Sequence, residues 1–190
     1  DNLDPTFLNQ SMRRLGEVIL RLYEGPKPVI TEVDGFAVGG GLGLALASDI
    51  TYATERAQFS MGFIKIAATP DMGSSFFLAE RVGLVKAKEM AFTGDIVGAE
   101  EALRIGLVNG VVAHEEISGE VMKLASYIAT KSPRTLADTK RMMNRSHLLD
   151  LRSVLELEAS VQPVMLLSEE HRAAIRKIFA RWEQGLGASE

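Results

Sequence analysis

The sequence predicts an α/β fold followed by a region that is entirely helical. Short β-branched runs alternate with segments of helical periodicity up to about residue 112, which is the pattern of an α/β domain. From Ile117 onward, every apolar repeat has helical spacing. We therefore expect two parts, an α/β core over residues 1–115 and a helical region over residues 116–190.

The first predicted element is a helix that begins after Asp4. Asp4 is a suitable N-cap, Pro5 suits the first helical position, and Gly25 with Pro26 ends the helix. Apolar residues recur there at helical spacing and predict one buried stripe, made of Leu8, Met12, Leu15, Ile19 and Leu22.

A strand, a glycine turn and a short helix follow in that order. Residues 28–33 are β-branched and are bounded by Pro and by Asp34-Gly35, which predicts a strand. Residues 36–38 lead into three glycines, Gly39 to Gly41. The apolar residues 42–48 predict a short buried helix directly after them.

The remaining elements of the first part are short. Residues 49–53 and 57–60 predict two strands. Gly83 separates two predicted helices, and a third ends at Gly106. These helices cover residues 72–82, 84–92 and 99–105, and residues 107–112 return to extended structure.

The second part is predicted as four helices. The first two cover residues 117–128 and 133–144, and the third begins near Leu151 and should kink or end at Pro163. Ser168 caps the last helix. Its apolar stripe of Ile175, Ile178, Phe179 and Trp182 requires a partner surface in this domain or in a neighbouring subunit.

Composition excludes several classes of function. The 190 residues are 46% hydrophobic and carry a net charge of -4, which gives no basic footprint for nucleic acid. No apolar run is long enough to span a membrane, and the absence of cysteine excludes disulfides and thiolate chemistry. The three histidines lie far apart without metal-like spacing, so we expect no metal site. The absence of cysteine fits a reducing compartment, so we expect a cytoplasmic location.

The glycine turn has two possible roles. Glycines before a helix let the backbone approach a ligand, and the helix N-terminus presents N–H groups that stabilise negative charge. The alternative is a turn selected only for tight packing. The turn lacks the lysine of a phosphate-binding loop and the spacing of a dinucleotide fingerprint, which disfavours nucleotide binding.

Three long segments resemble the crotonase, or enoyl-CoA hydratase/isomerase, superfamily. They are residues 27–50 (KPVITEVDGFAVGGGLGLALASDI), 57–83 (AQFSMGFIKIAATPDMGSSFFLAERVG) and 92–112 (FTGDIVGAEEALRIGLVNGVV). The resemblance implies the ClpP/crotonase-like spiral of short strands and helices, with residues 116–190 as a trimerisation region. It implies a homotrimer or dimer of trimers, and no cofactor besides the coenzyme A of an acyl-CoA substrate.

The resemblance also implies an oxyanion hole for a thioester enolate. The Gly40 N–H is the donor carried by this chain, whereas the family's second donor lies upstream of the first helix, so we expect the N-terminal part of the fold to be absent. Substrate-binding positions implied by the same motifs are Ala37, Val38, Gly39, Gly41, Gly43, Met61, Phe63 and Pro70.

Two hydratase glutamates of the family are replaced here, by Gly43 and Phe63. Addition of water needs an acid and a base that these residues cannot supply. Asp71 follows Pro70 in a turn where isomerase branches of the family place an acidic residue, and it is the catalytic candidate. Its alternative role is to cap the helix expected to begin near Met72.

The leading expectation is therefore an enoyl-CoA isomerase of fatty acid metabolism, with Asp71 transferring the proton. The alternative is an acyl-CoA binding or assembly subunit without hydratase activity, suggested by the two missing glutamates. An Asp71→Asn variant separates these hypotheses, because an isomerase would lose turnover and a binding protein would keep its ligand affinity.

Overall fold

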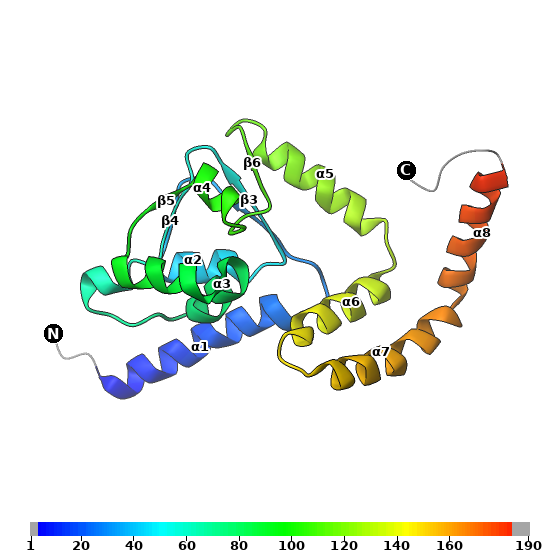
Figure 1. Cartoon of the computed structure of the whole chain (residues 1–190), viewed down its shortest axis with the longest axis horizontal. Helices are drawn as coiled ribbons and strands as arrows, with labels where there is room; N and C mark the ends of the chain where they lie inside the picture. The colour runs from blue at the N-terminus through cyan, green and yellow to red at the C-terminus, as the bar shows by residue number, and fades with distance from the viewer. Residues whose placement is uncertain (1–3, 184–190) are drawn as a thin grey trace. The chain divides into compact units, whose positions relative to one another are not determined.

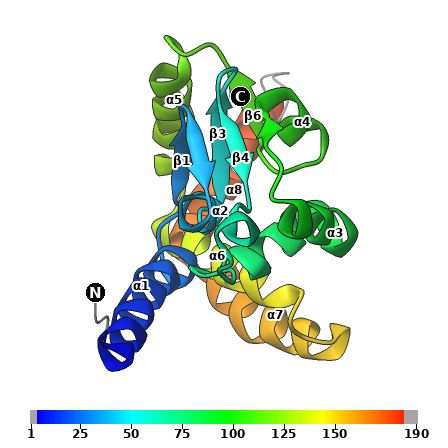
Figure 2. The same ribbon diagram turned by 90° about the vertical axis from the view of Figure 1, so that its left-hand side faces the viewer.

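The computed structural model describes residues 4–183, and the chain divides into two compact units, Asp1–Thr130 and Lys131–Glu190. Helix α5 (Ile117–Ala129) belongs to the first unit, because it packs on strands β1 (Ile30–Val33) and β3 (Ile50–Thr54) (Figure 2). The division between compact units therefore lies after α5, whereas the sequence analysis places the boundary before it.

Two small sheets form the framework of the first unit. In the first sheet, β1 pairs in parallel with β3, and β3 pairs in parallel with β6 (Gly110–Val112). In the second sheet, β2 (Phe36–Val38) runs parallel to β4 (Gln58–Ser60), and β4 pairs antiparallel with β5 (Val97–Gly98). The predicted α/β class is confirmed, with β6 shorter than the extended stretch expected over residues 107–112.

Helices surround these sheets in the order shown in Figure 1. They are α1 (Pro5–Glu24), α2 (Gly40–Leu46), the 3-10 helix η1 (Phe63–Ile66), α3 (Ser74–Thr93) and α4 (Ala99–Arg104). The short α2 packs against α3 and against β1 and β2. Gly83 interrupts α3 with φ 77° and ψ 155°, which confirms the predicted break between two helices.

The first helix is confirmed in its ends but not in its buried stripe. Asp4 accepts a hydrogen bond from the Thr6 N–H at 2.9 Å, as an N-cap does. Only Ile19 of the stripe is buried, whereas Met12 is 45% exposed and Leu15 37% exposed. The prediction of one buried stripe was wrong because part of this helix face borders an open pocket.

The core of the first unit lies where α2, α3 and the strands meet. Its most deeply buried apolar side chains are Phe59, Leu42, Leu46, Leu78 and Leu107. Asp49 Oδ2 accepts a hydrogen bond from the Val29 N–H at 2.7 Å, which ties the start of β1 to the end of α2. This bond gives Asp49 a structural role.

The second unit consists of α6 (Pro133–Ser146), α7 (Leu151–Leu166) and α8 (Glu169–Glu183). Ser168 Oγ accepts from the His171 N–H, which confirms the predicted cap of the last helix. Helix α7 does not end at Pro163 but continues to Leu166. Among residues 4–183, no helix is both long and apolar enough to cross a membrane.

Candidate functional site

The turn between β2 and α2 requires glycine at position 39. Gly39 has φ 57° and ψ -121°, a combination that a side chain would strain. Its N–H donates to the Ser60 carbonyl at 3.0 Å, and its carbonyl accepts from the Gly43 N–H at 3.1 Å. These two bonds join the glycine turn to β4 on one side and to α2 on the other.

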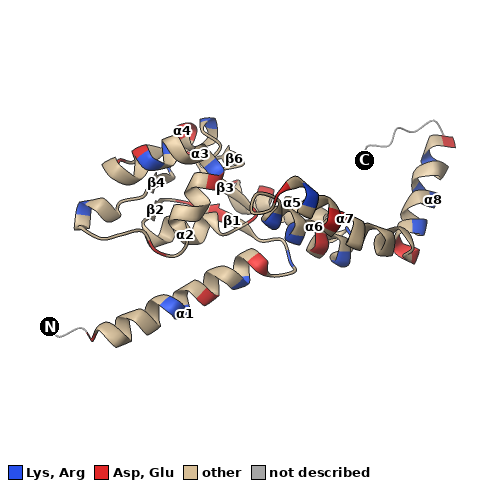
Figure 3. Ribbon diagram, turned by 60° about the horizontal axis from the view of Figure 1, so that its bottom comes forward, with Lys and Arg blue, Asp and Glu red and all other residues tan. Residues whose placement is uncertain are grey.

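Helix α2 begins at Gly40, so the N–H groups of its first turn have no partner within the helix. Strand β2 and helix α2 carry no Lys, Arg, Asp or Glu, as Figure 3 shows. Gly40 itself faces another chain segment closely. A Cβ atom placed on it would lie 3.0 Å from Met72 Sδ and 3.2 Å from Asp71 Oδ1.

Asp71 thus brings a carboxylate to the start of α2. Its Oδ1 is buried and has no hydrogen-bond partner among the residues that the structure describes. A buried carboxylate oxygen without a partner is costly, so such atoms are candidates for a role in binding or catalysis. The geometry brings together a carboxylate and a helix N-terminus, as the resemblance implies.

The alternative capping role of Asp71 is contradicted. Helix α3 begins at Ser74 rather than near Met72, and its N-cap is Gly73, with φ 71° and no side-chain capping bond within the described chain. Met72 also has a positive φ of 48°, so helical structure cannot start there. Sequence patterns did not reveal this, since methionine carries no signal for a left-handed conformation.

A pocket of about 660 Å³ lies beside this carboxylate. Met12 and Leu15 of α1 form one wall, and residues 67–72 form the other, including Pro70 and Asp71. Its volume falls within the roughly 300–1,000 Å³ usual for small-molecule sites. Met12 and Leu15 were not predicted as pocket residues, because helical apolar spacing does not distinguish a core face from a pocket wall.

The other predicted site residues are divided between core and surface. Ala37 and Met61 are buried in the core, and neither lines the pocket beside Asp71. Phe63 is also in the core, where its ring would lie 3.4 Å from a Cβ on Gly39. Val38 is 45% exposed on β2.

The two remaining predicted glycines of α2 differ in their surroundings. Gly41 has open space where a side chain would project, whereas Gly43 is tightly covered by residues 72–74.

A second polar cluster lies at the carboxyl ends of β1 and β3. Arg56 donates two hydrogen bonds of 2.6 Å to Asp34, and Thr54 Oγ1 donates a third at 2.9 Å. His114 lies beside them, with Nδ1 2.9 Å from Asp34 Oδ2. The hydrogen bonds from Arg56 hold the pKa of Asp34 well below its ordinary value. This cluster joins strand ends, which is a structural role.

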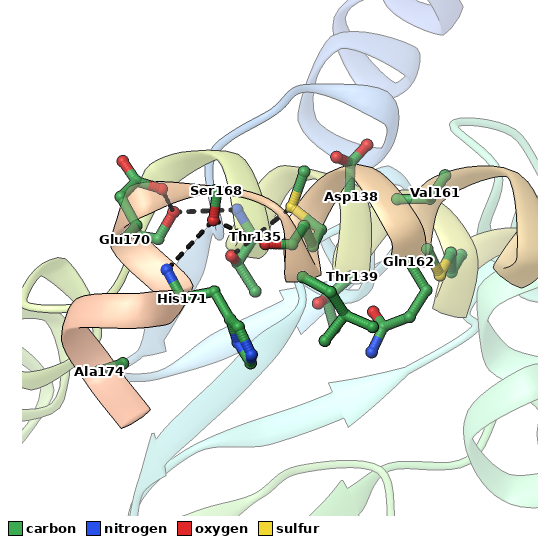
Figure 4. A pocket seen from close by; sticks show the side chains of 13 residues that line it. Thr135, Asp138, Thr139, Val161, Gln162, Ser168, Glu170, His171 and Ala174 are labelled. Carbon is green, nitrogen blue, oxygen red and sulfur yellow. Dashed lines mark hydrogen bonds between the residues drawn. The ribbon is translucent and has the colours of Figure 1, made fainter. Parts of the chain in front are cut away.

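The second unit contains a pocket of about 390 Å³ between its helices (Figure 4). Two serine hydroxyls in its wall make hydrogen bonds at helix ends. Ser132 Oγ donates to Glu170 at 2.8 Å and accepts from the Thr135 N–H, while Ser168 Oγ accepts from the His171 N–H. These hydroxyl groups cap α6 and α8. They are therefore weaker candidates for ligand binding or catalysis than the unpartnered Asp71 Oδ1. Among residues 4–183, no cluster of three or more His, Asp or Glu could hold a metal ion.

Comparison with known proteins gives a consistent result. The family model described as Enoyl-CoA hydratase/isomerase matches residues 5–183. Crotonyl-CoA hydratase of Syntrophomonas wolfei is 35% identical over 83% of this chain, and the 1,2-epoxyphenylacetyl-CoA isomerase of Escherichia coli K12 is 32% identical over 95% of it. Other matched relatives also carry hydratase names.

A solved structure shows the same fold. The enoyl-CoA hydratase/isomerase from Cupriavidus metallidurans CH34 superimposes with a TM-score of 0.89 and 34% identity over 94% of this chain, which confirms the crotonase fold. The chain spans 61% of the length of the Syntrophomonas relative, 71% of the Escherichia relative and 67% of the Cupriavidus structure.

Proposed function

Because the chain belongs to the enoyl-CoA hydratase/isomerase family, we propose that it moves a carbon–carbon double bond in an acyl-CoA thioester. Asp71 is the acid–base group, and the Gly40 N–H is one donor to the thioester oxygen. One observation carries this assignment. Asp71 Oδ1 is buried, has no partner among residues 4–183, and lies 3.2 Å from the position that a Cβ on Gly40 would occupy.

Hydration is disfavoured by the residues at positions 43 and 63. The resemblance places the two hydratase glutamates there, and this chain has Gly43 and Phe63. A glycine and a phenylalanine cannot activate water or protonate carbon. Neither position has free space for an added carboxylate, because the Met72 carbonyl covers Gly43 and Phe63 is buried against Gly39. The isomerase assignment is therefore preferred although several relatives carry hydratase names.

The proposed reaction needs one carboxylate and no water. The Asp71 carboxylate takes a proton from C2 of a 3-enoyl-CoA, and the electron pair of that C–H bond forms a C1–C2 double bond while negative charge moves to the thioester oxygen. Backbone N–H donors stabilise this charge, and each such donor commonly contributes about 10²–10³-fold in rate. The protonated Asp71 then returns the proton to C4, and the double bond moves to C2–C3.

The pocket beside Asp71 supports an acyl substrate. Its walls are formed by Met12, Leu15, Ala67, Ala68, Pro70 and Met72, which are apolar, together with Thr69 and Asp71. An apolar chain would lose contact with water in such a pocket, which favours its binding. We assign the pocket to the part of the acyl chain that follows the reacting carbons.

The test is the conversion of a 3-enoyl-CoA to its conjugated 2-enoyl isomer, followed by ultraviolet absorbance. Asp71→Asn should lower kcat by about 10²–10⁴-fold, the usual contribution of a general acid–base group. Asp95→Asn is the matched control, because Asp95 is exposed and lies outside the pocket. It should leave kcat unchanged.

A saturated acyl-CoA of the same length gives the second readout of this test. Asp71→Asn should bind it about as well as the wild type, since the carboxylate acts on the proton rather than on binding. Turnover retained by Asp71→Asn would refute the assignment of Asp71. Ligand binding by a wild type with no turnover of short or long 3-enoyl substrates would support the binding-subunit alternative.

The trimer or dimer of trimers implied by the resemblance is also a proposal. Phe179 and Trp182 are both more than half exposed on α8, with their rings 5.5 Å apart. An exposed aromatic pair of this kind favours a partner surface. Light scattering with size-exclusion chromatography should give a mass near three or six chains, and a monomeric mass would contradict the proposal.

A further inference from the structure

Gly43 lies in unusually close contact with the turn that carries Asp71. A Cβ atom placed on Gly43 would lie 2.7 Å from the Met72 carbonyl oxygen and 3.2 Å from Ser74 Cβ. Contacts below 3.0 Å with a backbone atom are not tolerated without movement, because core packing leaves no free volume. The turn therefore rests directly on the face of α2 that Gly43 leaves bare.

Among the glycines of α2, Gly43 alone approaches the backbone of this turn, whereas a Cβ on Gly40 would meet the side chains of Met72 and Asp71. A Cβ on Gly41, two residues earlier in the same helix, would meet no atom within 4 Å. Helix α2 thus does not need glycine throughout in order to pack. Glycine at position 43 serves the approach of one particular segment, residues 72–74.

The position of the Asp71 carboxylate is set by the backbone of this turn. Met72 and Gly73 have consecutive positive φ values of 48° and 71°. The Asp71 carbonyl accepts two hydrogen bonds from Ser74, from its N–H at 2.9 Å and from its Oγ at 2.7 Å. Ser74 is completely buried. Since Asp71 Oδ1 has no hydrogen-bond partner among the described residues, its position depends on the backbone of the turn.

From these contacts we propose that Gly43 is a positioning residue for Asp71. Its missing side chain lets the Met72 carbonyl settle on α2, and this places Asp71 Oδ1 beside Gly40. The inference rests on the proposed isomerase function and extends it to a residue that has no side chain of its own to transfer a proton. Gly43 thus helps to position the Asp71 carboxylate for proton transfer. It also stands where the family resemblance places a hydratase glutamate.

The first experiment compares Gly43→Ala with Gly119→Ala. The added methyl group at position 43 must push the Met72 carbonyl away by several tenths of an ångström. Because small misplacements of a catalytic group are costly, kcat should fall about 10- to 100-fold, with KM changed by less than about threefold. Gly119 is a helical glycine with open space around it, so Gly119→Ala should keep the wild-type kcat.

A double-mutant cycle with Asp71→Glu distinguishes positioning from general packing. In the wild type, the longer side chain overshoots and lowers kcat. In the Gly43→Ala background, where the turn is displaced, the extra methylene should recover part of the loss, so the two effects should not add. Strictly additive losses would indicate a packing role and would overturn the inference.

The outcomes are separable from those of the proposed function. Retained turnover in Asp71→Asn removes both proposals. Loss of turnover in Asp71→Asn together with wild-type kcat in Gly43→Ala refutes only the positioning role. If Gly43→Ala does not fold, the substitution is made in a Met72→Gly background, and the double variant is compared with Met72→Gly alone. Glycine adopts a φ of 48° without strain, so the turn can move to accommodate the added methyl group. Equal kcat in that pair would also refute the positioning role.

Discussion

Replacement of Gly39 by alanine should destabilise the protein through backbone strain. Gly39 has φ 57° and ψ -121°, a combination that costs an alanine about 1–3 kcal/mol. Contact adds little, since the nearest atom to the new methyl would be Phe63 Cζ at 3.4 Å. For a chain of 190 residues, a loss of about 2 kcal/mol corresponds to a fall in Tm of roughly 4–8 °C.

Gly98→Ala provides the matched control for this prediction. Gly98 also precedes a helix as its N-cap, but its φ is -74° and the space around it is open. Alanine there should change the free energy of unfolding by less than about 0.5 kcal/mol. Thermal and urea unfolding, followed by circular dichroism, measure both variants. Equal losses in the two variants, or an unchanged Tm in Gly39→Ala, would refute the strain argument.

Three further predictions follow from burial, charge and the pocket. Phe59→Ala should lower the free energy of unfolding, measured by urea denaturation, by about 3–5 kcal/mol, because Phe59 is fully buried. Phe36 lies on the neighbouring strand and is 75% exposed, so Phe36→Ala should lower it by less than about 0.5 kcal/mol. The Asp34 pKa is depressed by Arg56, so its contribution to stability is present above about pH 4 and is lost as pH falls further. Asp34→Asn should therefore show a smaller drop in Tm than the wild type between pH 6 and pH 3. Met12→Trp should fill part of the pocket and lower kcat/KM for long acyl chains about tenfold or more relative to short ones. Val18 lies on the same helix outside the pocket, so Val18→Trp should leave this ratio unchanged.

Each of these three predictions has an outcome that contradicts it. Equal losses in the two phenylalanine variants would contradict the assignment of Phe59 to the core. Parallel acid profiles for the wild type and Asp34→Asn would show that the hydrogen bonds with Arg56 contribute nothing to pH-dependent stability. An unchanged chain-length profile in Met12→Trp would exclude this pocket as the acyl site.

Local sequence signals were sufficient for most elements of the fold. Strands β1, β3 and β4 were predictable because each is a β-branched or alternating run between turn residues. The break at Gly83 was predictable because glycine in a helical pattern marks an end. Strand β5 was not predicted, since its two residues are too short for any periodicity to register.

Only those residues of the candidate site that belong to a recognisable sequence motif could be predicted. The family resemblance pointed to Asp71, through the turn that it shares with Pro70, and to Gly40, through the glycine run. The left-handed conformation of Met72 was not predictable, because a non-glycine residue at φ 48° is held by its surroundings and leaves no local pattern. The exposure of Met12 was missed for a similar reason, since only the three-dimensional structure shows what a helix face borders.

The fit between Gly43 and the Met72 carbonyl has a consequence for how such a site can change during evolution. A glutamate restored at position 43 would collide with the Met72 backbone before its carboxylate could act. A second change, which moves residues 72–74 away from α2, must therefore come first or at the same time. That change would also displace Asp71, which belongs to the same turn. Under the proposed function, reaction type therefore depends on two segments together, and a single substitution at position 43 should not change it.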